Sequence, residues 1–435
     1  MDLVRRMLVL GIAGACAAIA ARPAWAQSRA DTLALSRRAA VDTALARNPG
    51  LHVAREQIAE AEARVVEASA FPDPTVSADL LGQPNVFRPG GNTGGDFAVG
   101  LTVPFPQKFH LRGAVSRGDL EAVQFGYAQL QQQTASATAQ AYDALLVAER
   151  HRSDLTEGKA LAEDFLKKTE ARFDAGTAAR LDVLKAKVDV AAAENALIAN
   201  GRDISTARSN LNRLLGRAVG APVALSDSLS VPPGLPALDA LVRTAHASRP
   251  ELHGLLSQQA GAHAATSLAR QYWMPDLSFE VEKNFVDGVP NSYTTTLGFT
   301  VPLFFWNHQR GEVAESRHRE SELAAAYRDQ SAQVEQDVRV AWANADAAYR
   351  QARYLGDELL PEARRALDIA LTSYGLGGSS ALEVLDARRT LLDAEGQYAD
   401  ALGAANDARA ELERAAGAPL ETISGGTPDG DANDH

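Results

Sequence analysis

The residues that could do chemistry are few and poorly grouped. The chain has nine histidines and one cysteine, Cys16, in 435 residues. His246 and His253 are seven residues apart, a spacing that a helix can place on one face, but no third ligand accompanies them. A catalytic nucleophile, a phosphate-binding loop or a zinc-protease helix would each leave a recognisable motif, and the sequence has none. We therefore expect no enzyme, no cofactor and no resident metal ion.

The start of the chain predicts export. Two arginines precede an apolar run from residue 7 to 21, and a small-x-small pattern ends at Ala26. We expect residues 1–26 to be a signal peptide, so that Gln27 begins the mature chain. A lipoprotein signal that ends at Cys16 is the alternative.

The charge of the chain argues against a nucleic-acid partner. The net charge is −12, and removal of the predicted signal, which carries +2, leaves −14. Binding to phosphates requires an excess of lysine and arginine, which this chain lacks.

The sequence also contains an internal repeat. Residues 48–52, Asn-Pro-Gly-Leu-His, return as Arg-Pro-Glu-Leu-His at 249–253, and residues 173–176 return at 374–377, both at an offset of 201. A constant offset over so much chain indicates a tandem duplication of about 200 residues.

Each copy is expected to contain the same elements. An Ala/Glu/Arg-rich helical segment comes first, a β-hairpin of alternating apolar and polar residues follows, and a proline-free stretch then predicts a long helical hairpin. The β-hairpins are expected at about 72–106 and 275–304, and the helical hairpins at about 113–215 and 312–415. The repeats themselves are placed at 27–217 and 239–417.

Three further features interrupt this pattern. Pro361 should kink the long helix that contains it. Residues 218–238 are rich in proline, glycine and serine and indicate a surface connector. Residues 418–435 predict a disordered acidic tail.

The four expected strands have one apolar and one polar face. Phe97, Val99, Phe279 and Leu297 fall on the first, and Asp96, Glu280, Glu282 and Thr296 fall on the second. Four strands are too few to close into a barrel, and unpaired strand edges are costly in lipid. Three chains that share one barrel would together supply twelve strands and leave no edge unpaired. The apolar face would then meet lipid and the polar face a water-filled lumen. A soluble hairpin with one buried face is the alternative.

Several motifs resemble the TolC-type outer-membrane efflux factor family. These are the duplicated Pro-x-Leu-His segments, the Val-Pro-Phe-Pro and Val-Pro-Leu-Phe endings at 103–106 and 301–304, the Phe/Tyr-x-x-Gly turns followed by Leu-Asp/Glu-Val-Leu, and Leu-x-x-Leu-Leu-Gly at 211–216. The resemblance covers residues 32 to 417. It implies a mainly α fold, in which long antiparallel helical hairpins form a periplasmic α-barrel. Four strands per chain would contribute to a homotrimeric, 12-stranded transmembrane β-barrel.

The resemblance also implies partners and cargo. Residues 301–311 are similar to the heavy-metal (CzcC-like) branch, which implies a passive exit duct for heavy-metal cations. The implied partners are outer-membrane lipid, a periplasmic adaptor (membrane fusion protein) and an inner-membrane RND pump. Two alternatives stay open: a drug or type I secretion channel of the same fold, and a soluble periplasmic adaptor with helical hairpins.

In this family the tips of the helical hairpins meet the adaptor and close the aperture. The residues that the resemblance places at the tips are Phe173, Gly176, Leu181, Asp182, Tyr374, Gly377, Leu382 and Glu383. The glycines could instead serve only to permit tight turns. Asp174 is a candidate for a threefold acidic ring at the aperture, and a solvated aspartate is the alternative.

Overall fold

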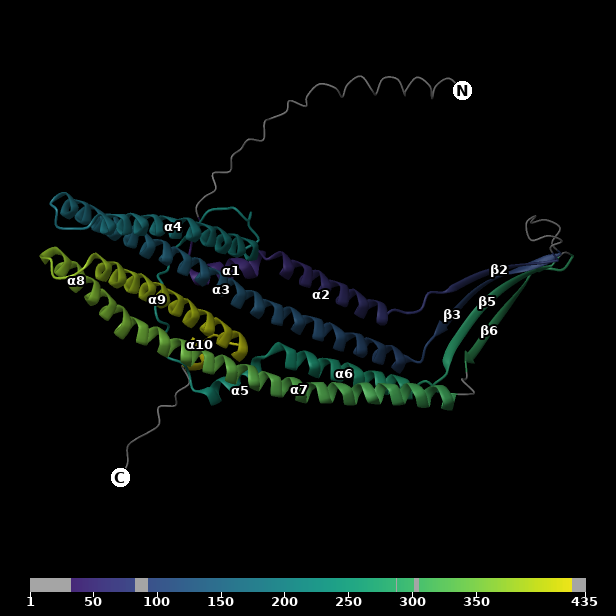
Figure 1. Ribbon diagram of the computed structural model, residues 1–435. Coiled ribbons are helices and arrows are strands. Elements are labelled where there is room, and N and C mark those ends of the chain that lie inside the picture. Colours follow the sequence, from purple (N-terminus) through teal and green to yellow (C-terminus); the bar gives the residue numbers. More distant parts are fainter. Residues whose placement is uncertain (1–32, 83–92, 287, 301–304, 425–435) are drawn as a thin grey trace, which may run out of the picture.

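The computed structural model describes residues 33–82, 93–286, 288–300 and 305–424. The predicted signal peptide, the Val-Pro-Leu-Phe ending at 301–304 and residues 425–435 lie outside this range. The described chain is elongated, with helical hairpin tips at one end and a sheet at the other (Figure 1). Most of it is helical.

The two repeats contain corresponding series of helices. The first contains α1 (Arg37–Arg47), α2 (Pro49–Ala68), α3 (Pro106–Asp174) and α4 (Arg180–Leu214). The second contains α5 (Leu238–Ser248), α6 (Pro250–Arg270), α7 (Phe305–Tyr354), α8 (Leu360–Leu376) and α9 (Ala381–Ala416). No proline occurs between Pro106 and Pro222, which lets α3 run for 69 residues.

The prolines of the repeated motif begin helices, as their fixed φ favours. Pro49 is the first residue of α2, and the Asn48 side chain before it accepts from the Gly50 amide at 2.8 Å and donates to the Leu214 carbonyl at 2.9 Å. In the second repeat the buried Arg249 replaces Asn48 and donates to the carbonyls of Arg414 and Ala415, each at 3.2 Å. In each repeat a different residue thus donates to the carbonyl groups that are left unpaired at the end of the returning helix.

The expected interruption at Pro361 takes the form of a π-helical turn. Residues Leu355–Leu359 form this turn, η1, between α7 and α8. Proline has no amide hydrogen to donate four residues back, so the widened turn accommodates the missing bond within an otherwise continuous rod.

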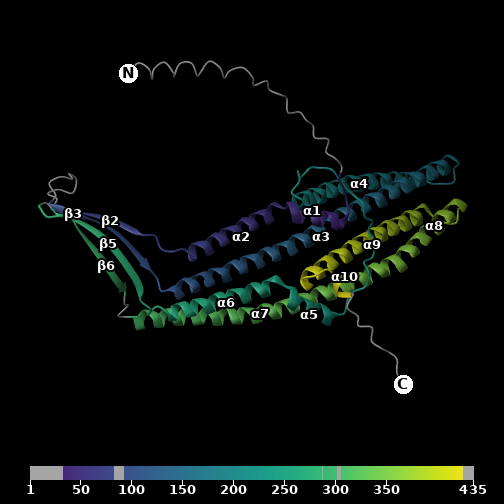
Figure 2. The same ribbon diagram turned by 180° about the vertical axis from the view of Figure 1, so that it is seen from behind.

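The larger sheet is antiparallel in the order β2-β3-β5-β6. Its strands are β2 (Thr75–Leu81), β3 (Gly94–Val103), β5 (Asp276–Val286) and β6 (Ser292–Thr300). The central pair, β3 and β5, joins the two repeats. In both views the strands continue from the ends of α2, α3, α6 and α7 (Figures 1 and 2).

The described residues contain two more strands than the four that we expected. β1 (Leu33–Leu35) pairs in parallel with β4 (Val223–Leu225), which lies in the segment predicted to be a surface connector. Val223 is buried. The connector therefore contributes to the core, because its backbone completes a two-stranded sheet.

The expectation of a disordered tail from residue 418 is wrong at its start. Residues Leu420–Ser424 form the short helix α10. Leu420 is buried, and Arg409 of α9 forms an ion pair with Glu421. Burial of one leucine and this ion pair hold the turn against the helices.

Apolar clusters lie along the helical part. In the first repeat the largest fully buried side chains include Tyr142, Leu145 and Leu211, and in the second Leu241, Val338 and Leu412. Within the described residues, no helix combines the length and apolar character that crossing a bilayer requires.

Candidate functional site

The first hairpin tip is a tight turn between α3 and α4. Gly176 has φ +73°, which strains any other L-residue, and the Thr177 amide donates to the Arg172 carbonyl at 2.8 Å. Asp182 accepts from the Ala179 amide at 3.3 Å and so caps the start of α4. Asp174 is exposed at the end of α3.

The second tip repeats this design. Gly377 has φ +82°, and the Gly378 amide donates to the Ser373 carbonyl at 2.8 Å. The Ser380 hydroxyl accepts from the Glu383 amide at 3.3 Å and caps the start of α9. A serine therefore does for α9 what Asp182 does for α4 in the first repeat.

The two aromatic tip candidates have opposite environments. Phe173 is 40% exposed, whereas Tyr374 is only 5% exposed. The Tyr374 ring lies 5.2 Å from that of Phe165, and the Arg172 guanidinium lies 4.4 Å above it. Tyr374 therefore joins the two tips from inside, and it does not present a surface to another protein.

The exposed leucines of the tips border a groove. Leu181 and Leu382 are each 59% exposed, at the starts of α4 and α9. They line a groove of about 730 Å³ that α3, α4 and α9 form. Arg388 also lines the groove, and this buried arginine of α9 pairs with Asp189 of α4, so it ties the second repeat to the first.

The sheet separates apolar from polar side chains. In the register, Phe97 is opposite Lys283, Val99 is opposite Val281, and Phe279 is opposite Leu297, so the apolar residues share one face. Phe97, Phe279 and Leu297 are between 46% and 71% exposed. Exposed apolar side chains gathered on one face are typical of a surface that contacts a membrane or another protein.

The opposite face is acidic. Asp79 and Asp96 are direct cross-strand neighbours, and Glu280 and Glu282 lie on the same side of β5. In the described strand residues the only basic side chain is Lys283, and it belongs to the apolar face. None of the four carboxylates forms a salt bridge with another described residue.

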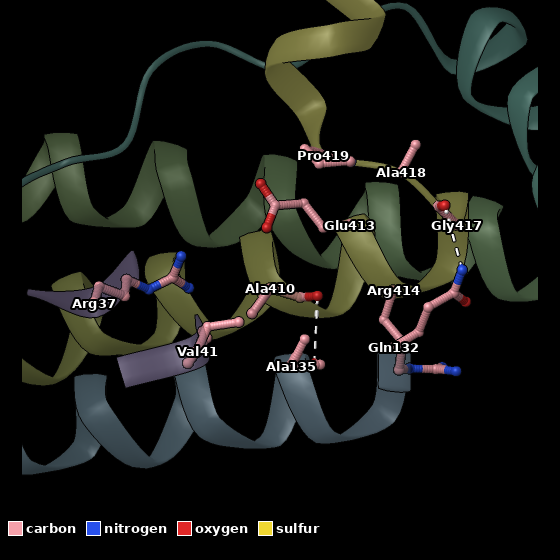
Figure 3. Close-up of a pocket in the computed structure, with 12 residues that line it drawn as sticks. Arg37, Val41, Gln132, Ala135, Ala410, Glu413, Arg414, Gly417, Ala418 and Pro419 are labelled. Carbon is pink, nitrogen blue, oxygen red and sulfur yellow. Dashed lines mark hydrogen bonds between the residues drawn. The ribbon is translucent and has the colours of Figure 1, made fainter. Parts of the chain in front are cut away.

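A buried ion pair that no sequence motif indicates lies in the first repeat, where it approaches α9 of the second (Figure 3). Arg37 of α1 binds Asp143 of α3 through Nε at 3.0 and 3.2 Å. Burial raises the pKa of Asp143, and Arg37 opposes this. Burial also raises the pKa of Asp407 in α9 to about 6, with a further contribution from Asp143.

One sequence signal could have found this ion pair. Asp143 lies four residues after Ala139 and three before Leu146, on the buried side of α3. A charged residue at an apolar position of a helix indicates a buried partner, but not which one.

The histidines stay apart. Nε2 of His151 lies 2.8 Å from Oδ1 of Asp400, and Nδ1 of His263 lies 3.2 Å from Oε1 of Glu320 in a different part of the chain. In the described ranges, no three histidine, cysteine, aspartate or glutamate side chains are grouped so that they could hold a metal ion.

The chain combines tandem helical hairpins, with turns at one end, and a two-faced sheet at the other end. Comparison with known families makes this specific. The profile described as "Outer membrane efflux protein" matches residues 40–217 and 241–418, and the chain belongs to this family. The double match reflects the tandem repeat.

The protein is accordingly an outer-membrane efflux channel component of the TolC type, with a helical periplasmic extension. Members of this family are channels rather than enzymes.

Two curated relatives have the same identity to this chain, and their names record different roles. The cobalt-zinc-cadmium resistance protein CzcC of Cupriavidus metallidurans is 26% identical over 252 residues, which are 57% of this chain and 58% of that protein. The pyoverdine export outer membrane protein OpmQ of Pseudomonas aeruginosa is 26% identical over 372 residues, 80% of this chain and 77% of that protein. The chain thus spans little more than half of the CzcC protein.

Solved structures share the fold. The outer-membrane channel OprN matches with a TM-score of 0.72 at 21% identity, over 88% of this chain and 90% of that one. CusC matches with a TM-score of 0.75 at 19% identity, over 89% and 94%. The open state of the Neisseria gonorrhoeae MtrE channel matches with a TM-score of 0.70 at 20% identity, over 88% and 89%.

Proposed function

We propose that this chain is the exit duct of a tripartite efflux system and that its cargo is heavy-metal cations. The observation that supports this cargo is the acidic face of the sheet, where Asp79, Asp96, Glu280 and Glu282 share their face with no basic residue of the described strands. A channel wall of one sign concentrates ions of the opposite sign and repels the others.

The assembly we propose is a homotrimer. In one chain β2 and β6 are the edges of the sheet, each with an unpaired row of backbone groups. Pairing of β6 with β2 of a neighbour would satisfy both edges, and three chains would give twelve strands. Leu297 and Phe279 would then face lipid, and Glu280 and Thr296 would face the lumen.

We propose that the hairpin tips receive a periplasmic adaptor, which works with an RND-type inner-membrane pump. Phe173, Leu181 and Leu382 offer exposed apolar surface at the tips and the groove. Gly176 and Gly377 form the turns, and Asp182 and Glu383 start the returning helices. Tyr374 would position the tips from inside, and three copies of the exposed Asp174 would form an acidic ring at the aperture.

The CzcC relative favours metal cargo, because its name records resistance to cobalt, zinc and cadmium. The OpmQ relative favours a second candidate, export of pyoverdine or a similar molecule, because its name records pyoverdine export and it matches a larger share of the chain. A drug or secretion channel would belong with this second candidate.

Growth assays separate these proposals. Deletion of the gene should lower the concentrations of zinc, cobalt or cadmium that stop growth and leave antibiotic tolerance unchanged. The full-length wild-type chain should restore metal tolerance. A variant with Asp79→Asn, Asp96→Asn, Glu280→Gln and Glu282→Gln should restore it poorly, while the control Lys283→Gln, on the opposite face, should restore it fully. Greater antibiotic sensitivity with unchanged metal tolerance would refute the metal cargo.

A further inference from the structure

The two outer strands of the larger sheet, β2 and β6, each have one unpaired side in the part of the chain that the structure describes. The side chains of β6 are more exposed than those at the same places in β3. Leu297 is 71% exposed, whereas its counterpart Val99 is 40% exposed. Phe299 is 69% exposed, and its counterpart Leu101 is half-buried. Because β5 lies beside β3 on that side, the extra exposure marks the place of a further strand beside β6.

The internal repeat shows how that strand would lie. β3 starts at Gly94 and β6 at Ser292, an offset of 198, which is also the offset of the Gly-x-Thr-Val-Pro motif at the end of both strands. β2 starts at Thr75 and β5 at Asp276, an offset of 201. β6 is therefore the counterpart of β3, and β2 is the counterpart of β5. The antiparallel pairing of β3 with β5 is thus a template for the pairing of β6 with β2 of another copy.

We infer that β6 of one copy pairs with β2 of the next copy in the register of the central pair. In the central pair Val99 lies opposite Val281. The counterparts of these two residues are Leu297 and Leu80, which are both apolar and exposed, and they face each other on the apolar side of the seam. The inference rests on the homotrimer proposed above, and it adds which residues of two copies touch.

The same register keeps the polar face continuous across the seam. Gly100 lies opposite Glu280 in the central pair, where an added Cβ would come within 3.3 Å of the carboxylate. The counterparts Gly298 and Asp79 repeat this pairing of a glycine with an acidic side chain. A shift of one residue would place the apolar Leu80 beside polar neighbours, so the alternation of both strands forbids it.

This register also closes a barrel of ordinary shape. Thr75 pairs with Gly100, which pairs with Glu280. Glu280 pairs with Thr296, which in the inferred register faces Leu81 of the next copy. One copy thus advances the register by six residues, from Thr75 to Leu81. Over three copies and twelve strands this advance tilts the strands by about 45°, within the range of transmembrane barrels.

A seam shifted by two residues is the alternative that keeps both faces. The two hairpins differ by such a shift, since Gly100 pairs with Thr75 and its counterpart Gly298 pairs with Ser278, two residues beyond the counterpart of Thr75. The same shift at the seam would advance each copy by eight residues and tilt the strands by about 55°, steeper than transmembrane barrels have. The geometry therefore favours the unshifted seam.

The junction between strands and helices supports the same seam. Lys108 at the start of α3 is buried and donates to Asp276 of β5 at 2.8 Å, so it ties the first repeat to the second. The counterparts of these residues are Trp306 and Thr75. Trp306 is 48% exposed, and the inferred pairing brings Thr75 of the next copy toward it. A contact with a large ring thus takes the place that the ion pair has within one chain.

The test is cysteine cross-linking of the full mature chain in detergent. The only native cysteine, Cys16, lies in the predicted signal, so an introduced pair has no competitor. With Leu80→Cys and Leu297→Cys, oxidation by copper–phenanthroline should convert most of the chain into a covalent species of three chains, which reduction separates. Residues directly opposite each other have Cα atoms about 4.5–5.5 Å apart, which a disulfide spans. Val99→Cys with Val281→Cys is the matched control, and it should bond within one chain.

Within one chain the Leu80 and Leu297 positions lie three strand spacings apart, about 14 Å, so their disulfide requires two copies. Two further pairs test a shift of two residues in either direction: Leu80→Cys with Phe299→Cys, and Ala78→Cys with Leu297→Cys. Diagonal neighbours are about 7–8 Å apart, so both pairs should cross-link several-fold less than the directly opposite pair.

The outcomes separate the register from the assembly. Preferential cross-linking of a shifted pair would overturn the register and leave the homotrimer standing. A chain that has the size of a trimer in detergent, with no cross-link from any of the three pairs, would overturn the pairing of β6 with β2. A chain that has the size of one subunit, again with no cross-link, would refute the homotrimer and this inference with it.

Discussion

Tyr374 and Phe173 occupy equivalent positions of the repeat, but Tyr374 is buried between the two tips and Phe173 is exposed. The sequence pattern assigns both to the tips, because a local motif surrounds each of them. Only the fold shows that Arg172 of the first hairpin covers the Tyr374 ring while Phe173 stays at the surface. The partner comes from about 200 residues away, so no local signal could have distinguished the two aromatic residues.

Replacement of Tyr374 should loosen both tips. Tyr374→Ala removes a buried aromatic ring and should cost about 3–5 kcal/mol, since the surrounding side chains collapse only partly into the space. Phe173→Ala, at an exposed site, should cost about 1 kcal/mol or less. Hydrogen exchange of residues 165–176 measures the difference. Equal protection in the two variants would contradict the position assigned to Tyr374.

The elements divide by length into those that periodicity could predict and those that it could not. The period of two separated the faces of β3, β5 and β6 correctly, and the register confirms the division for Phe97, Val99, Phe279 and Leu297. β1, β4 and α10 have three to five residues, too few for a period, and each depends on a distant partner. The π-helical turn likewise has no sequence signal beyond Pro361.

The turns at the tips should depend on the freedom of two glycines. An added Cβ at Gly176 or Gly377 would meet nothing within 4 Å, so alanine there adds only backbone strain, about 1–2 kcal/mol. Gly375, inside α8, has equally open surroundings and an ordinary φ, and Gly375→Ala should stabilise by about 0.5–1 kcal/mol. Thermal unfolding followed by circular dichroism checks the opposite signs. A destabilising Gly375→Ala would count against this explanation.

The two faces of the sheet should tolerate charge differently. Leu297→Arg places a cation on the apolar face and should oppose membrane insertion by about 2–4 kcal/mol if that face meets the middle of the bilayer. Thr296→Arg, one residue earlier and opposite Glu280, should insert normally. The amount of each variant that resists carbonate extraction from membranes provides the comparison. Equal insertion of the two would show that lipid does not cover the apolar face.

The duplication of the sequence explains most of the architecture of the chain. It predicts two hairpins, two tips and a sheet joined at its centre, and the matches at 40–217 and 241–418 confirm the repeat. The ion pair between Arg37 and Asp143 could not be predicted, because it joins two helices whose residues are 106 apart in the sequence. Positions that break the repeat symmetry are where the structure adds most to the sequence.

We propose that this chain is a subunit of a channel whose wall attracts cations. The most direct measurement is the reversal potential of the purified mature chain in planar bilayers across a potassium chloride gradient. We expect discrete conductance steps and a reversal potential that favours potassium, shifted toward zero when Asp79, Asp96, Glu280 and Glu282 are neutralised. Inserted protein that never conducts, or that favours chloride, would contradict the claim.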